Sequence, residues 1–156
     1  MSHIQTEHFQ KALLLMLQET FESANGYYLD GGDSLFETLN TISAPEASTP
    51  VGGKCATLAA QVKHTAFYLD TLERGVREQK FPKVDWNEIW QTVNVVSEDE
   101  WAQIKTELHE SYQRIVQLVN DTNQWPSERE IGGAIALITH SAYHLGEIRH
   151  ALCTIR

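Results

Sequence analysis

Residues 127–152 read SEREIGGAIALITHSAYHLGEIRHAL, and their apolar side chains recur every three or four positions. The members of this stripe are Ile131, Ile135, Ile138, Ala142, Leu145 and Leu152. Such spacing places the side chains on one face of an α-helix, and Ser127 is a suitable N-terminal cap directly after Pro126. The stretch therefore predicts a long amphipathic helix that begins just after Pro126.

Three further segments contain few glycines or prolines and have the same helical spacing. They extend over about His3–Ala24, Gly53–Gln79 and Ser97–Asn120. Asn25-Gly26 suits a left-handed helix stop, and Ser97-Glu98-Asp99-Glu100 matches a capping box. No segment alternates apolar and polar residues with period two, so strands are not needed. Four long helices predict a single all-α domain over residues 1–156, arranged as a four-helix bundle.

The connections between the four segments differ in length. The link between the third and fourth segments is short, which favours antiparallel neighbours. Residues 25–52 and about 80–96 are long enough for a crossover, so simple up-down-up-down order is not forced. The second of these connections contains Trp86 and Trp90. Two tryptophans in a polar loop suggest that it folds back over one end of the bundle.

Composition and charge restrict the class of protein. The 156 residues have a formal net charge of −9 and scattered basic residues, which disfavours nucleic-acid binding. No apolar run approaches the roughly 20 residues that span a bilayer. The apolar stretch Ala12–Leu17 lacks a basic flank and a cleavage site, so no signal peptide is expected. Cys55 and Cys153 are too few for a disulfide scaffold, and we expect a cytoplasmic protein with reduced thiols.

A pair of histidines, His140 and His144, marks the last predicted helix. Four-residue spacing puts both imidazoles on one helical face, one turn apart. Apolar residues border that face, so the rings would be desolvated at a cost unless they are bonded. Together they can supply two ligands to a transition metal. The same pattern also occurs without a metal, and a lone histidine is more often a surface or core residue.

His64 is the natural third ligand. It lies in the middle of the second segment at the margin of the apolar stripe, with Ala60, Phe67, Tyr68 and Thr71 as its helical neighbours. Three imidazoles with one open coordination position are typical of a catalytic metal site rather than a closed structural one. A metal there would lower the pKa of water or polarise a bound thiol, carbonyl or hydroxyl group.

Other metal sites fit the sequence less well. A ferritin-like di-iron bundle needs two Glu-x-x-His motifs, and this chain has one, at Glu147–His150. The zinc-protease pattern His-Glu-x-x-His fails after His109-Glu110, because Gln113 stands where the second histidine belongs. The sequence also lacks the motifs of dithiol redox sites, phosphate loops, dinucleotide sites and nucleophile elbows.

With its histidine pair followed by Leu145-Gly146-Glu147, the segment Ile131–Arg149 resembles the last helix of the DinB-like (DinB/YfiT) four-helix bundle family. The family pattern there is His-x-x-x-His, one residue, Gly, and often Gln or Glu. The segment Leu58–Leu69, with His64 inside it, looks like the family's second helix and its lone histidine. The resemblance covers most of the chain, including the Asp85-Trp86 loop and the start of the third helix at Trp101.

The resemblance implies an up-down-down-up bundle in which His64, His140 and His144 hold a divalent metal. Nickel or zinc is expected first, with iron or manganese as alternatives. The resemblance also implies a homodimer, and a small-molecule substrate or a low-molecular-weight thiol such as bacillithiol, mycothiol or glutathione. Some relatives are thiol-dependent transferases or isomerases, so a metal-dependent transferase, isomerase or hydrolase-like enzyme is expected.

Two alternatives to an enzyme stay open at this point. One is a metal-binding bundle without turnover, acting as a sensor or binding module, and the other is a structural bundle with vestigial histidines. The candidate groups for proton transfer or substrate orientation are Tyr68, Tyr143 and Glu147. Glu147 is either an acceptor for a histidine N–H group or a helix-surface charge. The sequence names neither the substrate nor the physiological metal.

The implied topology adds a prediction about the cysteines. Cys55 lies nine residues before His64, and Cys153 lies nine residues after His144. At about 1.5 Å of rise per residue, each would lie roughly 14 Å from the metal. We therefore expect both cysteines at the same end of the bundle, and whether they pair is left open.

Overall fold

A computed structural model describes residues 4–50, 56–81 and 83–156. In these ranges the chain forms seven helices and no strand, apart from an isolated antiparallel bridge between Pro50 and Thr57. The long helices are α1 (Thr6–Phe21), α4 (Leu58–Arg77), α6 (Glu98–Asp121) and α7 (Glu128–Ile155). The short helices are α2 (Leu35–Leu39), α3 (Ala44–Ala47) and α5 (Glu88–Thr92). The predicted all-α fold is confirmed for the described residues.

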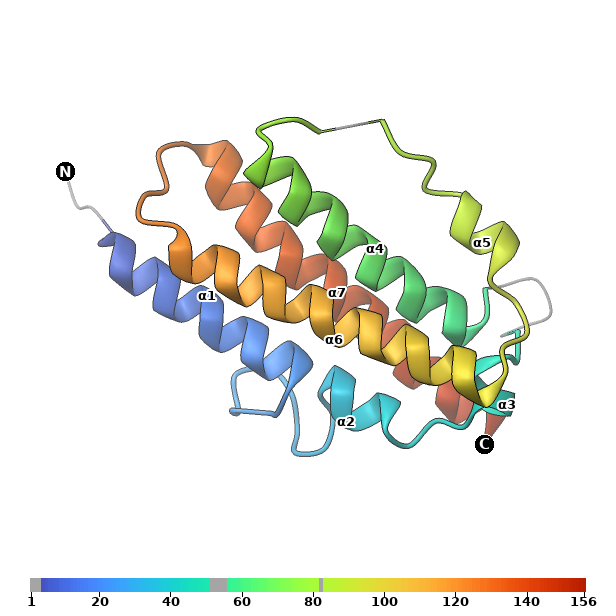
Figure 1. The fold of residues 1–156 in the computed structure, drawn as a ribbon. Helices are drawn as coiled ribbons and strands as arrows, with labels where there is room; N and C mark the ends of the chain where they lie inside the picture. Colours follow the sequence, from blue (N-terminus) through green and yellow to red (C-terminus); the bar gives the residue numbers. More distant parts are fainter. Residues whose placement is uncertain (1–3, 51–55, 82) are drawn as a thin grey trace.

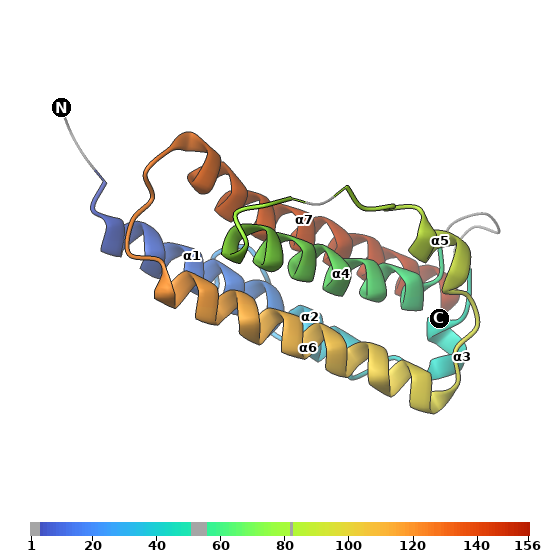
Figure 2. The same ribbon diagram turned by 45° about the horizontal axis from the view of Figure 1, so that its top comes forward.

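The four long helices lie side by side (Figures 1 and 2). Helix α4 packs against α6 and α7, and α1 packs against the same two helices. The colours of Figure 1 show that α1 and α7 run in one direction, whereas α4 and α6 run in the opposite direction. Helix α2 contacts α1, α3 contacts α4 and α6, and α5 contacts α4. The sequence analysis did not predict the short helices, and each of them packs on the outside of one or two long helices.

The core is built from the apolar face of each long helix. Fully buried side chains come from all four of them: Leu17, Phe21, Leu58, Leu69, Trp101, Leu108, Ile115, Leu145 and Ile148. The Phe21 ring stacks on Tyr112, with ring centroids 4.7 Å apart. The indole N–H of Trp101 donates to the Ile42 carbonyl at 2.8 Å, which joins the start of α6 to the connection between α2 and α3. Packing of these large side chains fixes the helices that carry the histidines.

Side-chain caps mark where three of the long helices begin. Ser97 and Glu100 form the predicted capping box at the start of α6, and Ser127 accepts the backbone N–H of Arg129 at the start of α7. Helix α4 begins at Leu58 rather than near Gly53. Thr57 has extended backbone angles and accepts the backbone N–H of Ala60, so it ends the non-helical segment there.

Helix α1 ends at Phe21, before the predicted end at Ala24. Glu19, in its last turn, is fully buried and accepts hydrogen bonds from the backbone N–H groups of Tyr27, Tyr28 and Leu29 at 2.7–3.1 Å. The chain turns back over the helix to reach this carboxylate, so it cannot continue as a helix. Gly26, with φ of +82°, lies inside this turn rather than at the helix end.

The connection of residues 122–127 joins two antiparallel helices that are not close neighbours. Helices α6 and α7 run in opposite directions (Figure 1), but each packs on α1 and α4 rather than on the other. The prediction of antiparallel neighbours was therefore right in direction and wrong in adjacency. An extended chain spans about 3.4 Å per residue, so this link can cross the roughly 14 Å diagonal of a square of helices spaced about 10 Å apart.

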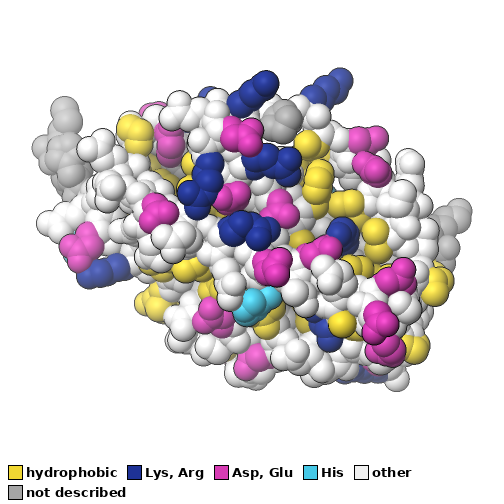
Figure 3. Space-filling view, in the orientation of Figure 1, with side chains coloured by type: hydrophobic (Ala, Val, Ile, Leu, Met, Phe, Trp, Pro, Cys, Tyr) yellow, Lys and Arg dark blue, Asp and Glu magenta, His cyan; other side chains and the backbone are white. Residues whose placement is uncertain are grey.

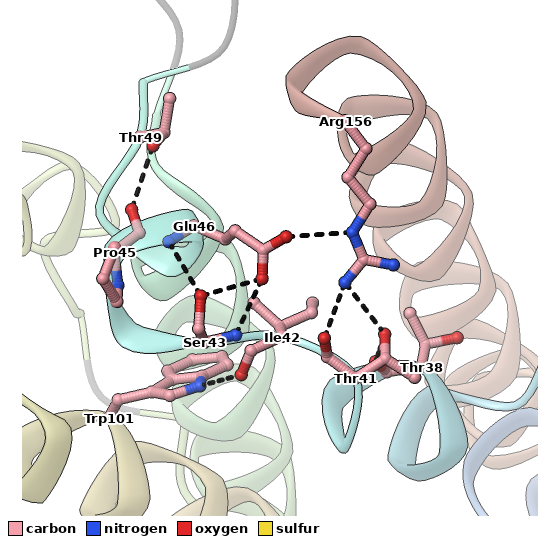
Figure 4. A network of polar contacts seen from close by, with 9 residues as sticks. All are labelled: Thr38, Thr41, Ile42, Ser43, Pro45, Glu46, Thr49, Trp101 and Arg156. Atoms are coloured by element: carbon pink, nitrogen blue, oxygen red, sulfur yellow. Dashed lines mark hydrogen bonds and ion pairs between the residues drawn. The ribbon is translucent and has the colours of Figure 1, made fainter.

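The C-terminal end of α7 is fastened to the segment around α3 (Figure 4). Arg156 donates to Glu46 Oε1 at 2.9 Å and to the Thr41 carbonyl at 2.6 Å. Hydrogen bonds from Arg156 first, and from Ser43 next, lower the pKa of Glu46 to about 2. Because Glu46 also closes the capping box of α3, the same carboxylate holds both the start of α3 and the end of α7.

The surface carries interspersed charges, and basic side chains lie among acidic ones on the face in Figure 3. Lys63 pairs with Glu107, and Arg114 pairs with Asp70, between α4 and α6. No helix within the described ranges has both the length and the apolar character needed to cross a membrane.

The two cysteines cannot be compared in space. Cys153 is exposed near the end of α7. Cys55 lies outside the described residues, so the expected placement of both thiols at one end stays a prediction.

Candidate metal centre

Three histidines from two helices meet between α4 and α7. One ring nitrogen each from His64, His140 and His144 lies within 4.8 Å of the other two. The ring centroids of His140 and His144 are 4.5 Å apart, and the His64 centroid lies 5.3 and 5.0 Å from them. The fold thus brings together the three histidines that the sequence analysis selected.

Packing on both sides of the site holds the two helices in place independently of the histidines. Helices α4 and α7 run in opposite directions and are in contact. The turns that flank the histidines bury Val62 and Ala66 on α4, and Leu145 and Ile148 on α7. These buried apolar groups hold the two helices in the positions that bring the imidazoles together.

Two ring nitrogens of the cluster are buried and have no hydrogen-bond partner among the described residues. His64 and His144 are only 7% and 5% exposed. Within the part of the chain that the structure describes, His64 Nδ1 and His140 Nε2 are buried without a hydrogen-bond partner. An unpaired buried polar group costs roughly 1–3 kcal/mol. Imidazole nitrogens suit zinc, nickel, iron and copper, so the donor set fits a transition-metal ion that would satisfy these atoms.

The protonation states of the rings also suit a metal ion. Burial, followed by repulsion from neighbouring imidazoles, lowers the pKa of His64 and of His140 to about 4. Burial lowers the pKa of His144 as well, although the nearby Glu147 carboxylate acts in the opposite direction. A histidine binds metal as the neutral imidazole. All three rings are therefore in the ligating form at neutral pH.

His144 is the one ring of the three with hydrogen-bond partners among the described residues. Its Nδ1 lies 2.6 Å from Gln61 Oε1 on α4 and 3.0 Å from Glu147 Oε2 on α7. The Tyr143 hydroxyl donates to the other oxygen of Glu147 at 2.7 Å. Glu147 is thus in contact with the histidine cluster rather than only a surface charge. Gln61 was not predicted, although its position three residues before His64 places it on the same helical face.

The two candidate tyrosines differ in their relation to the cluster. The Tyr68 ring stacks on His140 with centroids 3.7 Å apart and planes inclined by 22°. Burial raises the pKa of Tyr68, so its phenol keeps its proton at neutral pH. Tyr143 is 62% exposed, its ring meets that of His144 edge-on with centroids 5.2 Å apart, and its hydroxyl donates to Glu147. Tyr68 is therefore a wall of the site, whereas Tyr143 lies at its outer edge.

Two tryptophans from the connection between α4 and α6 complete the wall. The ring centroids of Trp90 and Trp86 lie 4.5 and 6.0 Å from that of His64. The ring centroid of Trp86 also lies 5.5 Å from that of Phe67 and 6.1 Å from that of Tyr68. The sequence analysis predicted that this loop folds back over one end of the long helices. The loop does fold back, but its tryptophans lie against His64, because α5 packs along α4.

Comparisons of the chain with protein-family models, with curated proteins and with solved structures found no match. The resemblance to the DinB-like family, carried by the residues around His64 and the His140–His144 pair, therefore stays a prediction.

Proposed function

We propose that this protein binds a divalent transition metal through His64, His140 and His144. The observation that carries the proposal is the meeting of three neutral imidazoles from α4 and α7, with buried ring nitrogens that lack partners within the described ranges. Nickel and zinc fit this donor set, with iron as an alternative. Manganese, which prefers oxygen ligands, fits less well.

We further propose that the four long helices form an up-down-down-up bundle of the DinB-like kind, in one domain. The directions of α1, α4, α6 and α7 in Figure 1 support this topology. A lone histidine on the second long helix, facing a His-x-x-x-His pair on the last, also supports it. Neither point depends on the identity of the metal.

The finer proposal is a metal-dependent thiol transferase or isomerase that acts on a small molecule. An ion held by three imidazoles would supply Lewis-acid activation of a bound thiol or carbonyl group. The chain itself contributes an aromatic wall, in which Trp86 and Trp90 lie beside His64 and Tyr68 stacks on His140. The protonated Tyr68 phenol is able to donate a hydrogen bond to a substrate, and it cannot serve as a base at neutral pH.

Metal content tests the binding proposal. Protein purified without a metal column or a histidine tag is analysed for metals, and is then titrated with nickel and zinc by calorimetry. We expect about one ion per chain, and loss of binding in His64→Ala. His109→Ala removes an exposed histidine of α6 and is the matched control. Less than about 0.2 ion per chain with no uptake on titration, or unaltered affinity in His64→Ala, contradicts the proposal.

A second experiment separates an enzyme from a binding module. Metal-loaded protein is incubated with bacillithiol, mycothiol or glutathione and electrophilic acceptors, and thioether products are measured by mass spectrometry. A transferase gives product with the wild type and none with His64→Ala. Bound metal with no turnover across the panel favours the alternative, a non-catalytic sensor or binding module.

A further inference from the structure

His144 differs from its two partners in how its ring is held. Its Nδ1 faces two oxygen atoms, Gln61 Oε1 at 2.6 Å and Glu147 Oε2 at 3.0 Å. In contrast, His64 Nδ1 and His140 Nε2 have no hydrogen-bond partner in the described part of the chain. His144 is therefore the one ring of the three that side-chain hydrogen bonds orient among the described residues, and these bonds come from both helices.

The chemistry of the two acceptors decides which nitrogen of His144 carries the proton. An amide oxygen and a carboxylate oxygen accept hydrogen bonds and do not donate them. Both acceptors therefore require a hydrogen on Nδ1, and they share this one N–H group. A neutral imidazole has a single N–H group, so Nε2 carries a free lone pair. The hydrogen bond made by one ring nitrogen thus selects the other as the metal ligand.

We propose that Gln61 and Glu147 are positioning residues, which hold His144 with Nδ1 protonated and present its Nε2 to the ion. This inference rests on the proposed metal-binding function. Gln61 lies three residues before His64 on α4, so a single turn of α4 both supplies one ligand and orients another on α7. The site is consequently pre-organised across the two helices before an ion enters.

The two positioning residues differ in how strongly each is expected to orient the His144 ring. Gln61 makes the shorter contact and makes it between helices, at 2.6 Å. Glu147 makes the longer contact within α7, and its carboxylate is shared with the exposed Tyr143 hydroxyl, which donates at 2.7 Å. Loss of the Gln61 acceptor therefore has the larger effect on His144, and loss of Glu147 the smaller.

The tautomer of His144 is measured first, in the metal-free protein. Long-range ¹H–¹⁵N NMR distinguishes protonated from unprotonated ring nitrogens, and comparison with His144→Ala assigns the signals. We expect Nδ1–H in the wild type and a loss of this preference in a Gln61→Leu, Glu147→Leu double variant. An Nε2–H ring in the wild type overturns the proposal without any variant, so failure of a variant to fold does not protect it.

Metal affinity is the second readout. Removal of an outer partner of a metal-binding histidine typically costs about 10–100-fold in affinity, and we expect nickel or zinc affinity to fall by this factor in Gln61→Leu. Gln61→Glu keeps an oxygen acceptor and should restore most of it. The matched control is Gln113→Leu, which removes a Gln–His contact of 3.0 Å to His109 on the exposed side of α6. It should change neither affinity nor the His144 tautomer.

The two readouts separate failure of this inference from failure of the proposed function. A wild type that binds no metal but has His144 in the Nδ1–H form contradicts the metal-binding function and leaves the orienting role of Gln61 and Glu147 standing. A wild type that binds metal, with unchanged affinity and unchanged tautomer in the double variant, contradicts the positioning role alone. A fall in affinity that Gln113→Leu reproduces also counts against it.

Discussion

Two buried polar clusters in this molecule are completed in different ways. At the end of α1, both carboxylate oxygens of Glu19 accept hydrogen bonds from backbone N–H groups of residues 27–29. Between α4 and α7, His64 and His140 each keep a buried nitrogen without a partner among the described residues. Buried polar groups are costly unless they are bonded. All the polar atoms of the Glu19 carboxylate are therefore hydrogen-bonded within the protein, whereas the histidine cluster has buried nitrogens that the proposed metal ion would bind.

Burial shifts the pKa in opposite directions in the two clusters, because the charged form is an anion for Glu19 and a cation for a histidine. Burial alone would raise the pKa of Glu19, but hydrogen bonds from the backbone of Tyr28, Leu29, Tyr27 and Asn25 outweigh it and lower the pKa. The charged form of a histidine needs acceptors instead, and none hydrogen-bonds His64 or His140 within the described residues. Burial therefore outweighs the nearby Glu147 carboxylate and lowers the pKa of both rings to about 4. The fold thus stabilises the charged form of Glu19 and the neutral forms of His64 and His140. The neutral imidazole is the form that would bind a cation.

The largest expected effect comes from breaking the Glu19 cluster. Glu19→Leu leaves three backbone N–H groups without their acceptor, and we expect the free energy of unfolding to fall by about 3 kcal/mol or more. Urea denaturation followed by circular dichroism measures this change. Glu7→Leu, on the exposed side of the same helix, is the control and should change stability by less than about 0.5 kcal/mol. A loss for Glu19→Leu as small as the control would contradict the comparison.

Completing the histidine cluster should have an effect of comparable size and opposite sign. Nickel or zinc at a concentration 100 times the dissociation constant stabilises a protein by about 2.7 kcal/mol, if it binds the folded state alone. We expect this gain in urea denaturation of the wild type, its reversal by a chelator, and its absence in His64→Ala. His109→Ala should keep the gain. A wild type whose stability does not respond to either ion speaks against an incomplete site.

The histidine cluster could be predicted from the sequence, whereas the Glu19 cluster could not. The His140–His144 pair was recognisable because the spacing of two residues on one helix is a local property. His64 could be added because its helical stripe and its resemblance to a known family agree. Glu19 was not recognisable, because its partners are backbone N–H groups, which nearly every residue carries. A pattern of side chains contains no trace of such an interaction.

Trp86, Trp90 and Gln61 mark the limit of prediction at the histidine cluster itself. The two tryptophans were noticed as unusual residues in a polar loop, but the path of the connection between α4 and α6 decided where they came to lie. Gln61 faces His144 only because α4 and α7 pack in one particular register. Residue type and helical face were predictable from the sequence, whereas contacts between elements depended on the tertiary packing.

The pH dependence of stability distinguishes the clusters next. His64 and His140 have lower pKa values in the folded state than the usual 6.5, so the unfolded chain binds more protons between pH 6.5 and about 4. Two rings whose pKa falls from 6.5 to about 4, at about 1.4 kcal/mol per pKa unit, set an upper limit of about 7 kcal/mol. Because water enters the site and weakens the effect, we expect the metal-free protein to lose at least roughly 2 kcal/mol as pH falls through this window. The Glu19 carboxylate contributes a separate loss, which begins below its usual pKa of 4.5.

Urea denaturation in metal-free buffer between pH 7 and pH 4 measures these losses. In the His64→Ala, His140→Ala double variant, the loss above pH 4.5 should be much smaller, whereas the loss below pH 4.5 should persist. Equal slopes in the wild type and the double variant above pH 4.5 would show that the rings are not held neutral by burial.

The smallest expected effect is the most specific to the comparison, because one type of substitution should act in opposite directions at the two clusters. His64→Leu removes the unpaired Nδ1 and keeps an apolar side chain against Trp90 and Trp86. In metal-free protein, we expect it to raise the free energy of unfolding by about 1 kcal/mol, whereas Glu19→Leu lowers it. Urea denaturation with a chelator present measures both. If His64→Leu destabilises the metal-free protein as Glu19→Leu does, the unpaired nitrogen carries no penalty, and the imidazole contributes to packing in the same way as any other core residue.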